Sequence, residues 1–167
     1  NLQQLADRIS RGGWRPQHSR EVLIPKASGG TRPLAICCLE DKIVQQLGAK
    51  ILEAIYDDSF HRHSYGFRPR RNTHQAIARL YKVIQERGEN CVVVEMDLEK
   101  FFNSMDHEKL LEILSVKIED HHFLRLIRRM LRNSTLTEEG EIRQNERGTP
   151  QGAPISPILA NIYLDAC

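Results

Sequence analysis

One acidic residue, Asp97, directly follows an apolar run, residues 91–96 (CVVVEM), and two phenylalanines come shortly after it. The run predicts a buried β-strand, so Asp97 would lie where a strand ends and delivers side chains to a site. A carboxylate there, assisted by a neighbouring backbone carbonyl, suits Mg²⁺, which prefers oxygen ligands. The same pattern suits a turn cap, with Phe101 and Phe102 in the core. The residues alone leave both interpretations open and identify no second carboxylate ligand.

Basic and aromatic side chains share residues 61–72 (HRHSYGFRPRRN), which contain no acidic residue. Guanidinium groups bind phosphates and stack on bases, and aromatic rings offer further stacking faces. Nucleic-acid contact is the favoured interpretation, and a solvated loop anchored by its aromatic rings is the alternative. The candidate nucleic-acid-binding residues of this loop are Arg62, Tyr65, Gly66, Phe67, Arg68, Pro69, Arg70, Arg71 and Asn72.

A second group of arginines lies in a predicted helix over residues 121–132. Its members are Arg125, Arg128, Arg129 and Arg132, whose spacings of three, four and seven residues place them on one helix face. Because like charges repel, such a stripe needs an anion or an acidic neighbour. A solvated face and an RNA-binding stripe both remain open.

A predicted β-hairpin over residues 20–36 has a glycine-rich turn at residues 27–30. Lys26 and Arg32 bracket that turn, where they could cover a triphosphate, although such pairs beside a turn are common. The two prolines of this hairpin, Pro25 and Pro33, are expected on edges or at bulges, because proline donates no ladder hydrogen bond.

Glycines and prolines also punctuate residues 148–157, which lead into an apolar helix. Gly152 would let a ligand or another chain approach closely. Gln151 is a neutral donor and acceptor that suits a base or a sugar. A purely structural loop followed by a helix cap at Ser156 is the alternative interpretation.

The remaining pattern predicts a compact α+β fold of mixed element order. Apolar periodicity indicates helices over residues 41–56, 73–87, 106–118 and 121–132, a second hairpin turning near residues 139–140, and a helix starting at residues 156–157. Asn72 and Gln75 have capping-box spacing at the start of the second helix, and Asp106 is expected to cap the third.

Overall composition restricts the class of protein without identifying it. The 167 residues, 40% hydrophobic and 28% charged with net charge +2, suit a folded protein of one domain or one and a half. No apolar stretch approaches ~20 residues, so we expect no membrane span. Four cysteines without a Cys-x-x-Cys pair suit the reduced thiols of a cytoplasmic protein. The absence of an initiator Met and the helical pattern at the last residue predict a longer parent protein.

Five blocks in order, IPKASGGTRPL, DKIVQQ, SYGFRPRRNTHQA, VEMDLEKFFNSMDHEKL and GTPQGAPISPILANIYLD, resemble the reverse transcriptases encoded by bacterial group II introns, the maturase family. The resemblance covers the chain from about residue 15 onward. It implies a right-hand polymerase of α+β class, with its fingers and the N-terminal part of its palm. The implied divisions are 1–75 for fingers, 76–105 for the palm strand and catalytic Asp97, 106–150 for further fingers helices and a hairpin, and 151–167 for the start of the second palm segment.

The resemblance also implies residue roles. Asp97 would be the first ligand of the catalytic metal, assisted by the Leu98 carbonyl, and Phe102 would stack under the sugar and exclude a 2′-hydroxyl. The other implied nucleotide-binding residues are Lys26, Arg32, Lys100, Phe101, Gln151 and Gly152. The loop around Arg68 would guide the template.

Three departures from the family pattern occur. Residues 35–38 (AICC) stand where Ile-Pro is usual, which leaves the shape of that loop open; Asn103 stands where many members have Asp; and Ala153 replaces a glycine. The Tyr-Ala-Asp-Asp strand with the other metal carboxylates, the thumb and the maturase helices would follow residue 167.

The expected function is that of an RNA-directed DNA polymerase that uses two Mg²⁺ ions, dNTPs, an RNA template with a DNA primer, and group II intron RNA as its partner. These 167 residues alone are expected not to polymerise. The alternative is an intron RNA-binding module that assists splicing without catalysis. Exposed apolar surface could also drive a homodimer.

Overall fold

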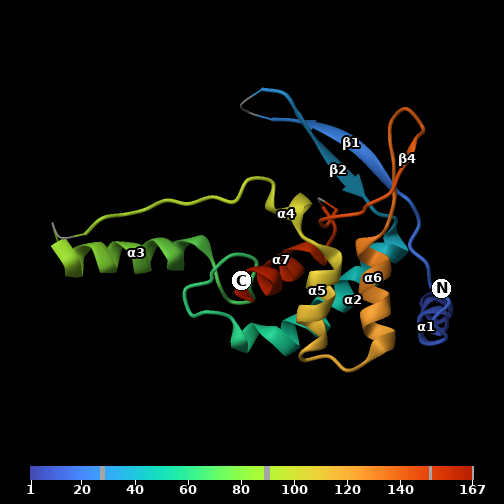
Figure 1. Cartoon of the computed structure of the whole chain (residues 1–167), viewed down its shortest axis with the longest axis horizontal. Helices are drawn as coiled ribbons and strands as arrows, with labels where there is room; N and C mark the ends of the chain where they lie inside the picture. Colours follow the sequence, from blue (N-terminus) through green and yellow to red (C-terminus); the bar gives the residue numbers. More distant parts are fainter. Residues whose placement is uncertain (27–28, 89–90, 151, 167) are drawn as a thin grey trace.

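A computed structural model describes residues 1–26, 29–88, 91–150 and 152–166. Its α+β class agrees with the sequence-based expectation (Figure 1). In chain order the elements are α1 (Leu2–Ser10), β1 (Ser19–Pro25), β2 (Thr31–Ile36), α2 (Leu39–Tyr56), the 3₁₀ turn η1 (Asp57–Ser59), α3 (Thr73–Arg87), α4 (Phe101–Ser104), α5 (His107–Ser115), α6 (His121–Leu131), β3 (Thr135–Leu136), β4 (Ile142–Arg143) and α7 (Ser156–Asp165).

The described strands form a four-stranded sheet in the order β2-β1-β3-β4. The predicted hairpin is confirmed: β1 and β2 pair antiparallel from Arg20↔Ile36 to Pro25↔Thr31. Pro33 lies in β2, the edge strand, where its missing N–H leaves no ladder acceptor unpaired. The sequence did not indicate that β1 also pairs in parallel with β3, which links the first hairpin to the second.

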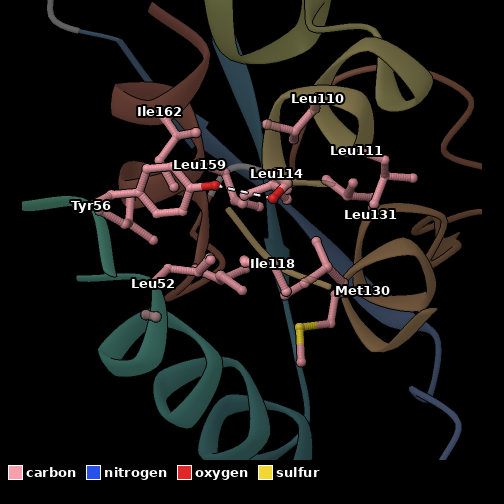
Figure 2. Close-up of a cluster of buried hydrophobic side chains, with 14 of the residues drawn as sticks. Leu52, Tyr56, Leu110, Leu111, Leu114, Ile118, Met130, Leu131, Leu159 and Ile162 are labelled. Atoms are coloured by element: carbon pink, nitrogen blue, oxygen red, sulfur yellow. Dashed lines mark hydrogen bonds between the residues drawn. The ribbon is translucent and has the colours of Figure 1, made fainter. Parts of the chain in front are cut away.

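The hydrophobic core lies between α2, α5, α6 and α7 (Figure 2). Each helix contributes an apolar stripe, and the contributing side chains include Leu52, Leu110, Leu114, Ile127 and Leu159, none of them exposed. The hydroxyl of Tyr56 donates to the Leu114 carbonyl oxygen at 3.2 Å, so this polar group of the core has an acceptor.

The predicted buried strand over residues 91–96 is wrong for this structure. The backbone of residues 91–98 belongs to no strand, and Val92, Val93, Val94 and Met96 are 61–88% exposed. This segment and α3 extend together away from the helical body (Figure 1), and α3 has no buried residue. The β-branched run favours an extended backbone, but a strand also needs a ladder partner, and the described residues supply none.

Helix starts agree with the sequence at two positions and differ at one. The capping box at Asn72 and Gln75 is present, with both hydrogen bonds at 3.0 Å. The Asp106 carboxylate caps α5 through the Glu108 and Lys109 amides. Ser156, in contrast, is not a cap: it is the first residue of α7, and its hydroxyl donates to the Pro150 carbonyl at 3.0 Å. Among the described residues, no helix combines the length and the apolar character needed to cross a bilayer.

Candidate nucleotide and nucleic-acid site

Three hydrogen bonds of 2.7 Å join the segment after Asp97 to the segment before α7, although about 45 residues of sequence separate them. The Thr149 amide donates to the Phe102 carbonyl at 2.7 Å, and the Gly148 amide donates to the Met105 carbonyl at 2.7 Å. His107 Nε2 is 2.7 Å from the Gly148 carbonyl oxygen. Because a carbonyl only accepts, Nε2 carries the hydrogen. Two of the stretches singled out by the sequence therefore form one unit.

Two glycines allow the close approaches that build this unit. Gly148 has φ +74°, and a Cβ there would lie 2.4 Å from the Phe102 carbonyl oxygen. Gly152 has φ +95°, and a Cβ there would lie 2.7 Å from Cδ1 of Leu34 in β2. The close approach that the sequence assigned to a ligand or another chain is made here by β2 of the same chain, so the hairpin strand becomes a wall of the candidate site. Gln151 lies outside the described residues.

The residues around Asp97 lie at the surface and are not enclosed by the fold. Asp97 and the Leu98 side chain are exposed, and Lys100 adopts a left-handed backbone with φ 52° immediately before α4. A non-glycine residue in this region stores strain, which is often found at functional sites. Phe101 and Phe102 are half-buried, with ring centroids 6.0 Å apart, and the Phe101 ring is 6.1 Å from that of Tyr163 in α7.

Lys26 and Arg32 lie on either side of the tip of the β1–β2 hairpin, and both are exposed. The Lys26 amide donates to the Gly30 carbonyl at 3.0 Å, and the Arg32 backbone pairs with Ile24. The sequence placed these cations correctly at the turn, and the structure presents both to solvent.

Oxygen donors at Asp97 fit a hard cation, but they do not complete a site. The Asp97 carboxylate and the Leu98 carbonyl are the kind of ligands that Mg²⁺ takes. No group of three or more metal-ligating side chains gathers anywhere in the described part of the chain. The neighbouring Glu99 carboxylate is 3.3 Å from Lys100 Nζ, in an exposed ion pair.

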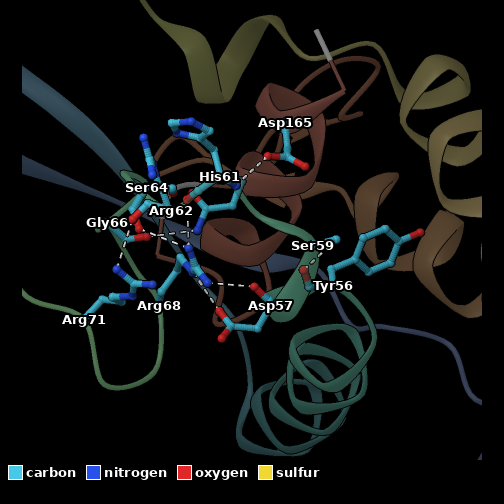
Figure 3. Close-up of polar contacts among 11 residues, drawn as sticks. Tyr56, Asp57, Ser59, His61, Arg62, Ser64, Gly66, Arg68, Arg71 and Asp165 are labelled. Carbon is cyan, nitrogen blue, oxygen red and sulfur yellow. Dashed lines mark hydrogen bonds and ion pairs between the residues drawn. The ribbon is translucent and has the colours of Figure 1, made fainter.

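Arg68 corrects the expectation for the loop over residues 61–72. Its side chain is only 5% exposed, because its guanidinium faces inward (Figure 3). It donates to a carboxylate oxygen and the carbonyl of Asp57, both at 2.7 Å, and to the carbonyls of His61 and Ser64 at 3.2 and 3.1 Å. It also lies over the Phe60 ring at 5.2 Å. With its donors used inside the protein, Arg68 holds the loop in shape rather than facing RNA.

Other residues of the loop face outward. Arg62, Arg70 and Phe67 are exposed, the last by 66% of its surface, and Pro69 and Gly66 are exposed beside them. Phe67 and Arg70 have positive φ values of 54° and 58°. Since such backbones are strained for large residues, the inward contacts of the loop must over-determine its shape.

Further contacts fix the loop against its neighbours. Arg71 stacks over Tyr65 at 5.5 Å and donates to the Arg62 carbonyl at 3.1 Å. Asn161 of α7 donates to the Gly66 carbonyl at 2.9 Å, and Asn72 is used as the cap of α3. The loop therefore lies against the helix that follows the Gly148–Gly152 segment.

The four arginines of the predicted stripe, three in α6 and Arg132 at its C-terminal cap, have three different environments. Arg128 and Arg132 donate to the two carboxylate oxygens of Glu108 at 2.8 and 3.0 Å. Arg129 donates to two backbone carbonyls near the N-terminus, while Arg125 is exposed. Glu108 is the acidic neighbour that the stripe needs. Glu108 is the third residue of a different predicted helix, so the sequence gave no sign of this pairing.

Comparison with known proteins decides the family. A family model described as "Reverse transcriptase (RNA-dependent DNA polymerase)" matches residues 24–167. The chain belongs to the reverse transcriptase family. The resemblance inferred from the five blocks is confirmed.

Named relatives of this reverse transcriptase chain include intron-encoded proteins. An "Uncharacterized 91 kDa protein in cob intron" of Schizosaccharomyces pombe is 44% identical over 87% of this chain and 18% of that protein. Protein YkfC of Escherichia coli is 37% identical over 98% of this chain and 43% of its own length. The "Group II intron-encoded protein LtrA" of Lactococcus lactis is 35% identical over 98% of this chain and 27% of its own length. The chain thus spans less than half the length of each of these relatives.

A solved structure shares the fold. A partial Cas6-RT-Cas1–Cas2 complex superimposes with a TM-score of 0.61 over 99% of this chain and 28% of that chain, at 22% identity. The likeness supports the reverse transcriptase fold, and it extends along nearly the whole of this reverse transcriptase chain.

Proposed function

We propose that this chain forms the fingers and the first part of the palm of an RNA-directed DNA polymerase encoded by a group II intron. The enzyme would copy an RNA template from a DNA primer with dNTPs. The observation that carries the proposal is the junction between Phe102–Met105 and Gly148–Thr149, formed by two backbone hydrogen bonds of 2.7 Å within the stretch that the family model covers. It joins the two segments that would enclose the incoming nucleotide.

In this proposal the hairpin and the joined loops bind the nucleotide. Lys26 and Arg32 would bind the triphosphate with exposed cationic groups, and the backbone amides of Lys100 and Phe101 would add hydrogen bonds to it. The Phe102 ring would lie under the sugar, where it would exclude a 2′-hydroxyl. Support comes from the backbone bond that fixes Phe102 to Thr149, since a ring that selects by shape must be held in place. Gly152 and Gln151 would complete this wall.

Asp97 and the Leu98 carbonyl would hold Mg²⁺, and their oxygen donors suit it. Bound Mg²⁺ ions supply charge neutralisation at the transferring phosphate and at the leaving pyrophosphate. Two such ions need more carboxylates than Asp97 alone, so the site would be completed by residues outside this chain. The chain's own contribution is to position the nucleotide and the first ligand.

The outward residues of the loop over 61–72 would contact the template. Arg62 and Arg70 offer guanidiniums to phosphates, and the exposed Phe67 ring offers a stacking face. Arg68 would act indirectly, by holding this loop against Asp57.

Primer extension tests the polymerase proposal. In the complete protein that carries these residues, Asp97→Asn should abolish extension of a DNA primer on an RNA template while leaving RNA affinity within about twofold. The 167-residue chain alone should bind RNA but extend no primer. Extension by the chain alone that Asp97→Asn removes would contradict the proposal that the metal site is incomplete.

A second candidate function is binding of intron RNA to assist splicing, with no catalysis by this part of the protein. The exposed cations and the Phe67 ring of the loop favour it, since they need neither metal nor nucleotide. Intron RNA binding that persists without Mg²⁺ and dNTPs, and that weakens in Arg62→Ala and Arg70→Ala, would support this function. Unchanged affinity in both variants would contradict the assignment of this loop to RNA.

A further inference from the structure

Five arginines line a single pocket between α6 and the segment that follows α1. They are Arg15, Arg125, Arg128, Arg129 and Arg132, and the rest of the lining is Pro16, Asn133 and Ser134. No acidic residue lines this pocket. We call these five residues the arginine pocket.

Two of the guanidiniums converge on the same acceptors. Nη1 of Arg15 lies 3.0 Å from the carbonyl oxygens of both Gly12 and Trp14, and Nη1 of Arg129 lies 2.9 and 3.0 Å from the same two oxygens. Partial burial lowers the pKa of Arg129, and the positive charges of Arg15 and Arg125 lower it further. Two cations therefore share two neutral acceptors, an arrangement that favours the approach of an anion.

Only one carboxylate offsets the charge of the pocket through a described hydrogen bond. Glu108 of α5 bonds Arg128 and Arg132, which leaves Arg15, Arg125 and Arg129 without a carboxylate partner among the described residues. Asp120, the cap of α6, uses its carboxylate on the amides of His122 and Phe123. Glu108 and Glu112 line the hollow on the other side of Arg125 and Arg128, so the pocket itself stays cationic.

We propose that the arginine pocket is a docking surface for the backbone phosphates of RNA, separate from the loop over residues 61–72 and from Asp97. Figure 1 places α1 and α6 at one end of the molecule and α3 with residues 91–98 at the other. An RNA that contacts both ends would therefore extend beyond the nucleotide site. That the bound polyanion is RNA rests on the proposed function. That the pocket is cationic rests on its five arginines and not on the proposed function.

The lining favours nucleic acid over an acidic protein. Arginines from Arg125 to Arg132 follow the α6 axis for about 10 Å, at ~1.5 Å per residue, which matches a strand with several evenly spaced phosphates. Planar guanidiniums bind phosphate oxygens in pairs. A protein interface needs an apolar or aromatic centre, and Pro16 is the one apolar residue in this lining.

RNA affinity measured by fluorescence anisotropy, with a labelled single strand and without Mg²⁺ or dNTPs, tests the pocket. The double variant Arg125→Ala/Arg132→Ala should weaken binding about tenfold. It should also reduce the slope of log affinity against log salt by about 0.7 for each lost phosphate contact. Arg87→Ala, which removes an exposed arginine from α3 at the other end, should change affinity less than twofold.

A substitution that strengthens binding gives the sharper test. Glu108→Gln removes the carboxylate that bonds Arg128 and Arg132, so it should tighten RNA binding severalfold, with a steeper salt slope. If the arginines had only a structural role, loss of their partner would lower thermal stability without tightening RNA binding. Melting temperature is therefore measured beside affinity.

The outcomes separate this proposal from the proposed function. If the Arg125→Ala/Arg132→Ala and Glu108→Gln variants bind RNA as the unsubstituted chain does, while Arg62→Ala/Arg70→Ala binds weakly, the pocket proposal is overturned and the template assignment stands. If both arginine pairs leave affinity unchanged, both proposals fail. Displacement of RNA from the pocket by poly-L-glutamate at equal charge concentration would also overturn the pocket proposal, because an acidic protein would then fit the site equally well.

Discussion

His107 Nε2 donates to the carbonyl oxygen of Gly148 across 2.7 Å, and this contact holds the start of α5 against the segment that leads into α7. The imidazole is only 4% exposed, so no solvent replaces the bond if it is lost. Asn145 donates to the same oxygen at 3.2 Å, which leaves Gly148 one remaining donor when His107 is changed.

His107→Phe should lower the free energy of unfolding by about 1–2 kcal/mol, because it keeps the ring volume and removes the buried donor. His107→Gln retains an N–H near the position of Nε2 and should lose less than half as much. Urea denaturation of the two variants measures the difference. Equal losses would show that ring packing, rather than the hydrogen bond, supplies the stabilisation.

Gly148→Ala should destabilise the chain by roughly 2–4 kcal/mol, since its Cβ would meet the backbone of Phe102 and Asn103 at 2.4–2.7 Å. Gly140→Ala is the matched control: Gly140 also has a positive φ, +87°, but nothing lies within 4 Å of its Cβ position. It should cost only the backbone strain, about 1 kcal/mol. Thermal denaturation of both variants separates the cost of the close approach from that of backbone strain. Similar losses of stability in the two variants would contradict the predicted cost of the close approach.

Arg68→Met should cost on the order of 3 kcal/mol, because it leaves the partly buried Asp57 carboxylate without its cation and four acceptors without their donor groups. Arg70→Met, two residues away on the exposed side of the same loop, should change stability by less than about 0.5 kcal/mol. RNA binding should show the reverse order: when folded proteins are compared, Arg70→Met should weaken RNA affinity more than Arg68→Met does. A stable Arg68→Met variant with weak RNA binding would indicate instead that Arg68 contacts RNA.

Asp41 should give a pH dependence of unusual sign. Burial raises the pKa of its carboxyl above the ordinary value, although the Gln17 amide at 2.9 Å lowers it in part. The folded protein therefore keeps a proton at pH values where the unfolded chain has lost it, so this group's contribution to stability falls as pH rises through that window.

Asp41→Asn keeps an oxygen for the Gln17 amide and removes the buried charge. The stability of the variant relative to the unsubstituted chain should thus be greater at pH 7 than at pH 4. Urea denaturation at both values checks this, and the other carboxylates cancel in the comparison. A relative stability that is lower at pH 7 would mean that the ionised form is favoured by the fold.

Local signals in the sequence predicted local structure well. The antiparallel pairing of β1 with β2, the capping box at Asn72 and the apolar periodicity of α2 each depend on residues close together in the sequence, and the structure has all three. Residues 91–96 failed because their pattern describes the backbone of a strand but not its partner.

The candidate site shows the same difference between local features, which the sequence indicates, and contacts between distant residues, which it does not. The sequence singled out Asp97 by its residue type and place, and the family resemblance added nucleotide-binding roles for Phe102 and Gly152; the roles of all three stay predictions. The sequence could not show that Arg68 faces inward, since its acceptors are mostly backbone carbonyls, which have no signature in the sequence. Arg15 was missed for a related reason: it joins the α6 arginines only through a contact between distant parts of the chain.

The exposed segment over residues 91–98 has a thermodynamic consequence for Asp97. Pairing of this backbone with a neighbouring strand and binding of a cation at Asp97 would both order the same few residues. Linked equilibria are reciprocal, so a strand that improves cation affinity tenfold is itself held tenfold more tightly once the cation is bound. A cation bound at Asp97 would then hold residues 91–98 and a partner strand together more tightly, and loss of that cation would loosen both.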